Sequence, residues 1–583
     1  MSRASCVYAL AGALLAMTLP VAGSAREWRS AELWGGDVRA LEVDPRDPDY
    51  VLAGTFSGQV YVSNDGGAGW RPAGRPGLFA GWSVQTLVFD PNQTRRVWAA
   101  LTRVWDETGY VAVSDDRGRS WRRSSAGLPG RQVYSLALVP GEPGVVYAGT
   151  RVGVYGSRDH GRTWRHLTGS HPELEKVTSL LVDRERRDTV LAGTWRRAYR
   201  SEDGGVTWSR LDDGMVLDSE VFSLQPVPGR PGELWASTCG WVYRGRALGD
   251  SWVRSSRGLA ERRATSFGVL PGGRLLAGTV DGVFASTDDG ASWERAGADG
   301  LAIHALEHHP ERPERVWAGT EGGGVWRSDD GGASFRPSTT GLSSLRVAGL
   351  AAAGGEIVAA VRHAGPASGV YSSFDGGRTF PVGPVRLPTV LDVAAQGGRV
   401  YAATEEGLYE RRDGDWTRLD GLGQARVEEV VALGRRLLAR VGEAIYERDG
   451  TDFRRRDLAG LRARSLVPAG DEVWLLDVAG RFHRLDDDDL EAIAVAVDVA
   501  ASGRRIATGD PRWPLLAIGE RDSALWPAAG DPFPLELWVE PEEVSSALVR
   551  DGRLLLGTVG YGVLVVDLSP ARPAMTPIVS TAR

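Results

Sequence analysis

The sequence of 583 residues predicts an all-β fold made of tandem β-propellers. The first observation is an octapeptide, S-x-D-x-G-x-[ST]-[WF], which recurs about every 43 residues and is represented by Ser157–Trp164. The second is that each repeat holds three or four short β-rich runs, separated by Pro, Gly or Asp turns and without a helical run. Four short strands in a unit of about 40 residues are typical of a propeller blade.

The octapeptide is predicted to form the hairpin turn between the third and fourth strands of a blade. Its Asp is suited to accept backbone N–H groups, and its central Gly allows a positive φ. A catalytic role for these carboxylates is rejected, because no enzyme needs the same acid on every blade. The predicted structural acids are Asp65, Asp116, Asp159, Asp203, Asp288, Asp330 and Asp375.

The number of repeats predicts two rings. The signal of the second strand, Ala-Gly-Thr or a relative, indicates about 13–14 blades, more than the 4–8 that one ring usually holds. It occurs near Thr55, Thr102, Thr150, Thr194, Thr238, Thr279, Thr320, Val361, Thr404, Arg440, Leu476, Thr508 and Thr558. We expect a first propeller over residues 26–343 with about seven blades, and a second, divergent propeller over residues 344–583 with six or seven.

Ring closure and the limits of the rings add two expectations. The segment Glu27–Ser30 is expected to complete a blade formed mostly by later residues, because propellers usually close by pairing strands from the two chain ends. A boundary between the rings is predicted near Leu342–Leu345, where the octapeptides begin to degenerate. The structural alternative is one ring of about ten blades.

The N-terminus and the composition restrict location and partners. Residues 1–25 combine Arg3, an apolar run and small residues before Ala25, which indicates a cleavable signal peptide and a secreted or periplasmic protein. No later segment is apolar enough to cross a membrane. The net charge is −7 with no basic stripe, which argues against nucleic-acid binding. The mature chain would keep one cysteine, Cys239, which is expected to be buried.

The octapeptide resembles the Asp box, or BNR repeat. The proteins that carry it include sialidases, sortilin-type receptors, two-propeller xyloglucanases and photosystem II stability and assembly factors. The resemblance covers residues from about Trp28 to Phe380 well and the remainder through blade rhythm only. It implies a propeller architecture but no single activity, because hydrolases, receptors and assembly factors share this scaffold.

Catalytic and cofactor motifs are absent from the sequence. It has no G-x-S-x-G elbow, H-E-x-x-H helix, P-loop or dinucleotide fingerprint, and it lacks the Arg-Ile-Pro motif of sialidases. The resemblance to xyloglucanases implies two carboxylates facing a cleft between propellers, but no local motif nominates that pair. His304, His308 and His309 are interpreted as turn polarity rather than a metal site. We therefore predict no catalytic residue, metal or cofactor.

The residues that vary between blades are the candidates for binding. The first strand of each blade should line the central channel, and one position on it is polar or aromatic in all seven first blades. Its residues are Arg39, Gln85, Tyr134, Thr178, Phe222, Thr265 and His304. They are predicted to hold a small ligand or peptide at the channel mouth, where concave sites usually lie, the alternative being a water-filled channel. Arg196, Arg197 and Arg200 are candidates for contact with an acidic partner, and the favoured alternative for them is a solvated rim.

Together these features predict an exported, non-enzymatic binding or assembly scaffold. It would recognise a protein or peptide on a propeller face, in the envelope or outside the cell. The alternatives are a glycan-active hydrolase resembling the two-propeller xyloglucanases, or a propeller that binds carbohydrate without turnover.

Overall fold

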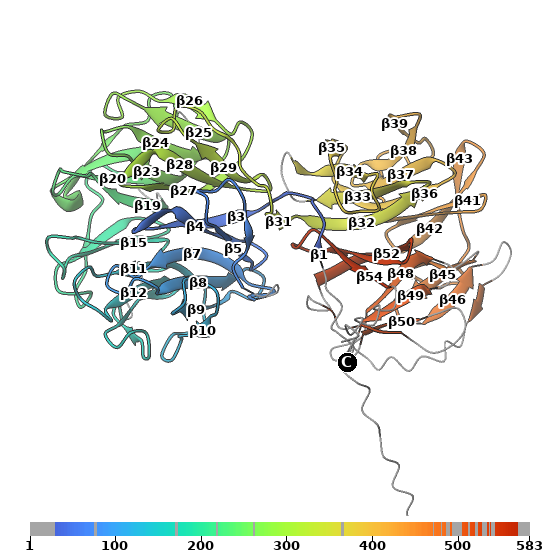
Figure 1. The fold of residues 1–583 in the computed structure, drawn as a ribbon, viewed down its shortest axis with the longest axis horizontal. Coiled ribbons are helices and arrows are strands. Elements are labelled where there is room, and N and C mark those ends of the chain that lie inside the picture. Colours follow the sequence, from blue (N-terminus) through green and yellow to red (C-terminus); the bar gives the residue numbers. More distant parts are fainter. Residues whose placement is uncertain are drawn as a thin grey trace, which may run out of the picture.

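The computed structural model contains two rings of β-sheets that lie next to each other and are joined by a narrow connection (Figure 1). It describes residues 29–568, except for 75–77, 170–172, 217–219, 260–262, 363–366 and a series of stretches between 470 and 542. The predicted signal peptide, residues 1–25, lies outside the described residues. In the described part of the chain, no helix has the length and apolarity needed to span a bilayer.

The first ring has seven antiparallel sheets, each made of four consecutive strands. Blade by blade, the strands are β3 Val38–Asp44, β4 Asp47–Thr55, β5 Val60–Ser63, β6 Arg71–Pro72; β7 Ser83–Phe89, β8 Val97–Arg103, β9 Thr108–Ser114, β10 Arg122–Arg123; β11 Val133–Leu138, β12 Val146–Thr150, β13 Gly153–Ser157, β14 Arg165–His166; β15 Ser179–Val182, β16 Val190–Gly193, β17 Ala198–Ser201, β18 Ser209–Arg210; β19 Val221–Pro226, β20 Leu234–Thr238, β21 Val242–Arg246, β22 Ser251–Arg254; β23 Ala264–Val269, β24 Leu275–Thr279, β25 Gly282–Ser286, β26 Glu294–Gly297; β27 Ile303–His309, β28 Arg312–Thr320, β29 Gly324–Ser328, β30 Arg336–Pro337. A 3₁₀ turn, η1 Ala247–Gly249, stands in the fifth blade.

The second ring has six four-stranded sheets in the described residues. Their strands are β32 Arg346–Ala353, β33 Glu356–Arg362, β34 Gly369–Ser373, β35 Val382–Val385; β36 Val390–Gln396, β37 Arg399–Thr404, β38 Gly407–Arg412, β39 Asp415–Arg418; β40 Glu429–Leu433, β41 Arg436–Val441, β42 Ala444–Asp449, β43 Asp452–Arg455; β44 Ala463–Ala469, β45 Glu472–Asp477, β46 Phe482–Leu485, β47 Leu490–Ala492; β48 Arg504–Asp510, β49 Trp513–Ile518, β50 Ser523–Trp526, β51 Phe533–Leu535; β52 Val544–Arg550, β53 Arg553–Thr558, β54 Val563–Asp567 and β1 Arg29–Ser30.

The all-β, tandem-propeller prediction is therefore confirmed, and the alternative of a single ring is wrong. One strand was misassigned from the sequence. Thr508 lies in β48, the first strand of its sheet, and the second strand is β49. The error has a simple cause, because Ala507-Thr508-Gly509 imitates the Ala-Gly-Thr signal in a part of the chain where the repeat has shortened.

The blades hold together through the side chains between neighbouring sheets. Second strands are buried on both faces, as in Val146–Thr150, because each lies between other strands of its sheet and between two blades. Large indoles fill the wedges between blades: Trp98, Trp235 and Trp317 are all fully buried. Buried indole side chains of this kind supply much of the packing energy of a core.

The two rings close in different ways. In the first ring, blade seven packs on blade one without sharing a strand: Trp317 joins the core of Val38 and Val51, and its Nε1 donates to Gly66 O (3.0 Å). In the second ring, β1 pairs antiparallel with β54, Arg29 opposite Val565, which confirms that the N-terminal segment completes a blade of later residues. The first ring is thus inserted in sequence between two strands of the second.

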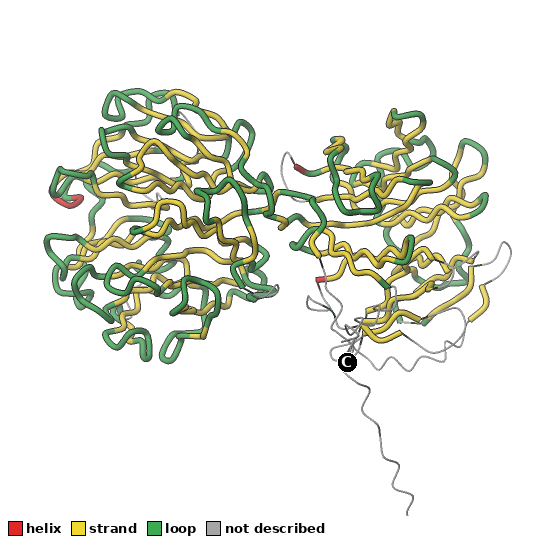
Figure 2. Tube along the Cα trace, viewed as in Figure 1, coloured by secondary structure: helices red, strands yellow, loops and turns green. Residues whose placement is uncertain are grey.

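Two chain segments cross side by side between the rings. Strand β2 Gly35–Gly36 leads into the first ring, strand β31 Ser343–Ser344 leads out of it, and the two pair in parallel. Gly36 has φ +152° and a Cβ there would lie 2.5 Å from Ser344 Cβ, so the approach requires glycine. Both β3 and β32 begin directly after this crossing, so each ring presents the start of its inner strands at the junction. The turn that holds η1 lies at the opposite side of the first ring (Figure 2).

Candidate functional site

The seven predicted channel residues share one structural position. In every blade of the first ring except the fourth, the register of the first two strands shifts at this residue, as between Val38 and Ala40 or Ile303 and Ala305. In the fourth blade Thr178 directly precedes β15. The residue before each is buried, and each of the seven is half-buried. A β-bulge of this kind re-aims one side chain out of the sheet.

Five of these seven side chains are engaged by their own blade or the next one. Thr178 Oγ1 donates to Val221 O (2.7 Å) and Thr265 Oγ1 donates to Ile303 O, which ties neighbouring blades together. Gln85 Nε2 donates to Ser83 Oγ (2.9 Å), and Tyr134 Oη donates to Gln132 Oε1 (2.5 Å). Phe222 lies under the Arg263 guanidinium, 4.9 Å from the ring centroid. These five do not converge on one site.

Arg39 and His304, by contrast, come together at the junction of the rings. Arg39 Nη2 donates to Asp37 Oδ2 (2.6 Å). His304 Nε2 lies 3.8 Å from Asp37 Oδ1 and 3.7 Å from Glu321 Oε2, so two carboxylates flank one imidazole. Since blades one and seven are neighbours in the closed ring, residues almost 270 positions apart become adjacent there.

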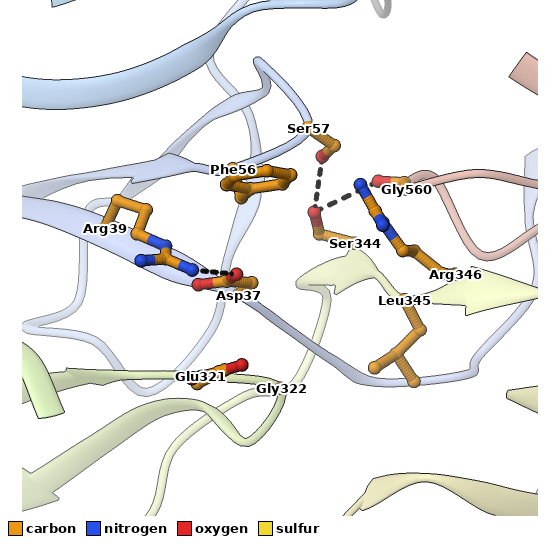
Figure 3. A pocket seen from close by; sticks show the side chains of 10 residues that line it. All are labelled: Asp37, Arg39, Phe56, Ser57, Glu321, Gly322, Ser344, Leu345, Arg346 and Gly560. Carbon is orange, nitrogen blue, oxygen red and sulfur yellow. Dashed lines mark hydrogen bonds and ion pairs between the residues drawn. The ribbon is translucent and has the colours of Figure 1, made fainter. Parts of the chain in front are cut away.

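Asp37, Arg39 and Glu321 line a cavity of about 210 Å³, called here the junction pocket (Figure 3). Its walls come from both rings and from the crossing segment. They are Asp37, Arg39, Phe56, Ser57, Glu321, Gly322, Ser344, Leu345, Arg346 and Gly560.

An arginine from each ring lies against the same phenyl ring in this pocket. The Arg39 and Arg346 guanidinium carbons are each 5.1 Å from the Phe56 centroid, and they approach it from different sides (Figure 3). Such cation–π contacts stabilise a guanidinium where water is scarce. Burial lowers the pKa of Arg346, and nearby Asp37 acts in the opposite direction.

The hydroxyl groups of the pocket are already bonded to one another. Ser57 Oγ lies 2.7 Å from Ser344 Oγ, and Ser344 Oγ donates to Gly560 O (3.0 Å). Tyr561 Oη donates to Ser57 O (3.2 Å). These bonds join a loop of the first ring, the crossing segment and the last blade of the second ring, and so fix the pocket walls.

Exposed apolar side chains gather on loops of the same face of the first ring. Each of these loops joins the second and third strands of a blade, and in an antiparallel sheet it lies at the end where the first strand begins. The residues and their exposed fractions are Val104 (52%), Trp105 (67%), Val152 (38%), Trp195 (48%) and Val280 (46%). We call these five residues the loop patch.

Positively charged side chains lie beside the loop patch. Lys176 Nζ lies 2.8 Å from the centroid of the Trp195 ring, and its backbone N–H donates to Arg151 O (2.8 Å), joining two blades. Burial lowers the pKa of this lysine. Burial also raises the pKa of Glu220, although the nearby charges of Lys176 and Arg263 act to lower it.

Comparison with known proteins identifies the architecture. No protein-family model and no curated protein matches this sequence. Among solved structures, the chain is similar to a GH74 xyloglucanase from Xanthomonas campestris, with 19% identity and a TM-score of 0.61 over 93% of this chain and 100% of that one. It is also similar to an ancestral GH74 enzyme, with 14% identity and a TM-score of 0.67 over 93% and 98%. The chain has the fold of a tandem β-propeller.

A third similar structure has a different role from the two GH74 proteins. It is PorZ of Porphyromonas gingivalis, an essential surface component of the type-IX secretion system, with 13% identity and a TM-score of 0.55 over 93% of this chain and 87% of that one. At such identities the likeness establishes the fold of the tandem propeller alone. The same fold therefore occurs in glycoside hydrolases and in a protein of a secretion machine.

The Asp boxes of the propeller clamp their turns, away from the junction pocket. In the third blade, Asp159 accepts hydrogen bonds from Thr163 N (2.9 Å), Thr163 Oγ1 (2.6 Å) and Ser157 Oγ (2.8 Å). These bonds, that of the Thr163 side chain first, lower the pKa of Asp159 to about 2. Such bonds satisfy the carboxylate completely within its turn.

Two sequence expectations about surface residues are wrong. Cys239 is exposed, because it stands in the loop between β20 and β21 rather than in a strand. Arg197 and Arg200 are half-buried in ion pairs, with Asp212 (2.6 Å) and Asp250 (2.7 Å), so only Arg196 of that group projects freely into solvent.

In the described residues no group of His, Cys, Asp or Glu side chains is arranged to hold a metal ion.

Sequence reasoning missed most of the junction pocket. Phe56, Glu321, Arg346 and Gly560 lie in four separate repeats, and nothing in their spacing indicates that they meet. One signal was available. Phe56 directly follows the second-strand pattern in the first blade of its ring, at a loop that a junction of two rings would use.

Proposed function

We propose that this tandem propeller is an exported, non-enzymatic binding or assembly scaffold that recognises a protein or peptide on the face bearing the loop patch. The observation that carries the proposal is the concentration of exposed apolar side chains on loops of four blades of one face. Single exposed apolar residues are ordinary, but several of them on the loops of one face mark a candidate interaction surface.

The chemistry of the face supports a protein partner. Tryptophan and arginine are enriched at protein interfaces, and a few such residues usually supply most of the binding energy. Trp105 and Trp195 are the largest members of the loop patch, and Arg196 and Lys176 are close to Trp195 in the chain or in space. The similarity to a secretion-system component is consistent with such a role.

Affinity capture from the envelope of the source cells, with two double variants, tests the proposal. We expect Trp105→Ser with Trp195→Ser to lose a stoichiometric partner that the wild type recovers. Val206→Ser with Val253→Ser is the matched control, because both valines are exposed (70% and 66%) but lie outside the patch loops. Retention of the partner by the tryptophan variant, or repeated failure of the wild type to recover any, contradicts the proposal.

A glycan-active hydrolase is the second candidate, favoured by one observation in the junction pocket. Inverting glycosidases hold two carboxyl groups about 6.5–9.5 Å apart. Asp37 and Glu321 both line the junction pocket and flank His304, whose Nε2 is 3.8 Å and 3.7 Å from their oxygens. This candidate predicts release of reducing ends from xyloglucan that is lost in both Asp37→Asn and Glu321→Gln. Binding of xyloglucan without such release would instead indicate a carbohydrate-binding propeller.

A further inference from the structure

Two arginines of the second ring face each other beside the junction pocket. Arg346 on β32 is the direct partner of Arg362 on β33 in the antiparallel register. Directly opposed like charges destabilise a strand pair. Both side chains are half-buried, so solvent screens their repulsion only in part.

Neither guanidinium has an acidic partner among the described residues. No ion pair or side-chain hydrogen bond joins Arg346 or Arg362 to a carboxylate within 29–568 as described, whereas nearby arginines such as Arg39, Arg411 and Arg426 are paired. Burial lowers the pKa of Arg362, as it does that of Arg346. The charged groups that face Arg362 are Arg426 and Glu405, which already pair with each other at 2.8 Å.

The charges around the pocket leave a surplus of one positive charge. Among the residues that line the pocket, the guanidinium groups of Arg39 and Arg346 balance the carboxylates of Asp37 and Glu321. Arg362, opposite Arg346 and outside the lining, adds the third guanidinium. Asp37 is taken by Arg39, which leaves Arg346 as the pocket cation without a partner. A monoanion would balance this surplus, whereas a phosphate dianion would meet excess repulsion from the two carboxylates.

We propose that the junction pocket binds a carboxylate of an acidic or C-terminal peptide residue, with Arg346 as its main ligand and Arg362 as a supporting charge. The guanidinium fork matches a carboxylate with two parallel hydrogen bonds. Phe56 and Leu345 provide apolar walls for the rest of the residue, and the cavity of about 210 Å³ accommodates one side chain. The inference rests on the proposed function, because it names a chemical feature of the partner.

A peptide suits this pocket better than an acidic sugar. Sugar recognition requires several free hydrogen-bonding groups, since each hydroxyl of the ring must be satisfied. Ser57 and Ser344 are already bonded to other groups of the protein, and Asp37 Oδ2 is bonded to Arg39, while Asp37 Oδ1 is buried without a hydrogen bond. The cation that remains without an ion pair is a guanidinium beside apolar walls, which matches a carboxylate on an apolar residue.

Ligand-observed NMR titration of the full chain tests the proposal, with N-acetyl-leucine, N-acetyl-leucinamide and digalacturonic acid as probes. We expect N-acetyl-leucine to bind and its amide to bind at least tenfold more weakly, since the amide lacks the charge. Arg346→Gln should weaken the binding of N-acetyl-leucine by about tenfold to a hundredfold, which is the range for the loss of a charged hydrogen bond. Arg336→Gln, which removes an exposed arginine elsewhere, should leave binding unchanged.

A second measurement covers the possibility that the variant is misfolded. Without ligand, Arg346→Gln and Arg362→Gln should each raise the Tm, because each removes one of two opposed charges. Equal binding of acid and amide, preference for digalacturonic acid, or unchanged binding by Arg346→Gln each overturns the proposal. In the capture experiment, a partner lost by the tryptophan variant but retained by Arg346→Gln overturns this inference and leaves the proposed function standing.

Discussion

Replacing Leu33 with alanine should destabilise the second ring and leave the first ring unchanged, although Leu33 precedes every strand of the first ring in sequence. Leu33 is 1% exposed and packs in a core with Val347, Val563 and Tyr371, all of the second ring. Hydrogen bonds hold its segment in place: Ala31 N donates to Val563 O (2.8 Å). The segment therefore belongs to the second ring energetically as well as topologically.

The expected size of the effect follows from the burial. A buried Leu→Ala change costs about 2–5 kcal/mol, part from lost transfer energy and part from the cavity. In a domain of this size, 1 kcal/mol shifts the Tm by about 2–4 °C, so the second ring should melt about 4–20 °C lower. Scanning calorimetry is the suitable assay, because two rings with separate cores should give separable transitions.

A matched control makes the test decisive. Leu259 is also 1% exposed, and it packs in a core of the first ring with Trp235 and Phe267. Leu259→Ala should therefore lower the other transition by a similar amount. If Leu33→Ala lowers the same transition as Leu259→Ala, or lowers neither, then the N-terminal segment does not close the second ring as described.

Three further changes have defined outcomes. Burial raises the pKa of Glu307 to about 8, so the protonated form that stabilises the fold is lost as pH rises. Glu307→Gln should therefore raise the Tm at pH 9 but not at pH 5. The exposed control, Glu311→Gln, should leave the Tm unchanged at both pH values. Asp159→Asn should lower the Tm by about 2–4 °C at pH 7. This difference should shrink below about pH 4, because the depressed pKa of Asp159 contributes stability only above the ordinary value. Gly560→Ala should weaken the contact between the rings, because the added Cβ would overlap Ser57. Limited proteolysis should then cleave the crossing segment faster than in the wild type. An unchanged cleavage rate would contradict that contact.

The fold could be predicted from the sequence because its determinants are local. Each Asp box lies within eight residues, and its Ser, Asp and Gly act on the same turn, as Ser157, Asp159 and Gly161 do. The bulge position could be found for the same reason, since it follows a buried aliphatic residue in every blade. What that position does in each blade could not be predicted, because Thr178 and Thr265 bond to the neighbouring blade while His304 meets acids at the junction.

The junction pocket was hidden from the sequence for a physical reason that also bears on its function. Its walls come from the first and last blades of both rings, so it exists only after two closures and one docking event. Elsewhere the bulge residues Thr178 and Thr265 bond to the next blade, whereas this pocket retains an arginine that forms no ion pair with a described carboxylate. Unpaired, half-buried charge is costly to keep in a folded protein. A ligand that supplies the missing negative charge offsets that cost, which is why the junction, rather than the channel mouth as a whole, is the part of this scaffold most suited to recognition.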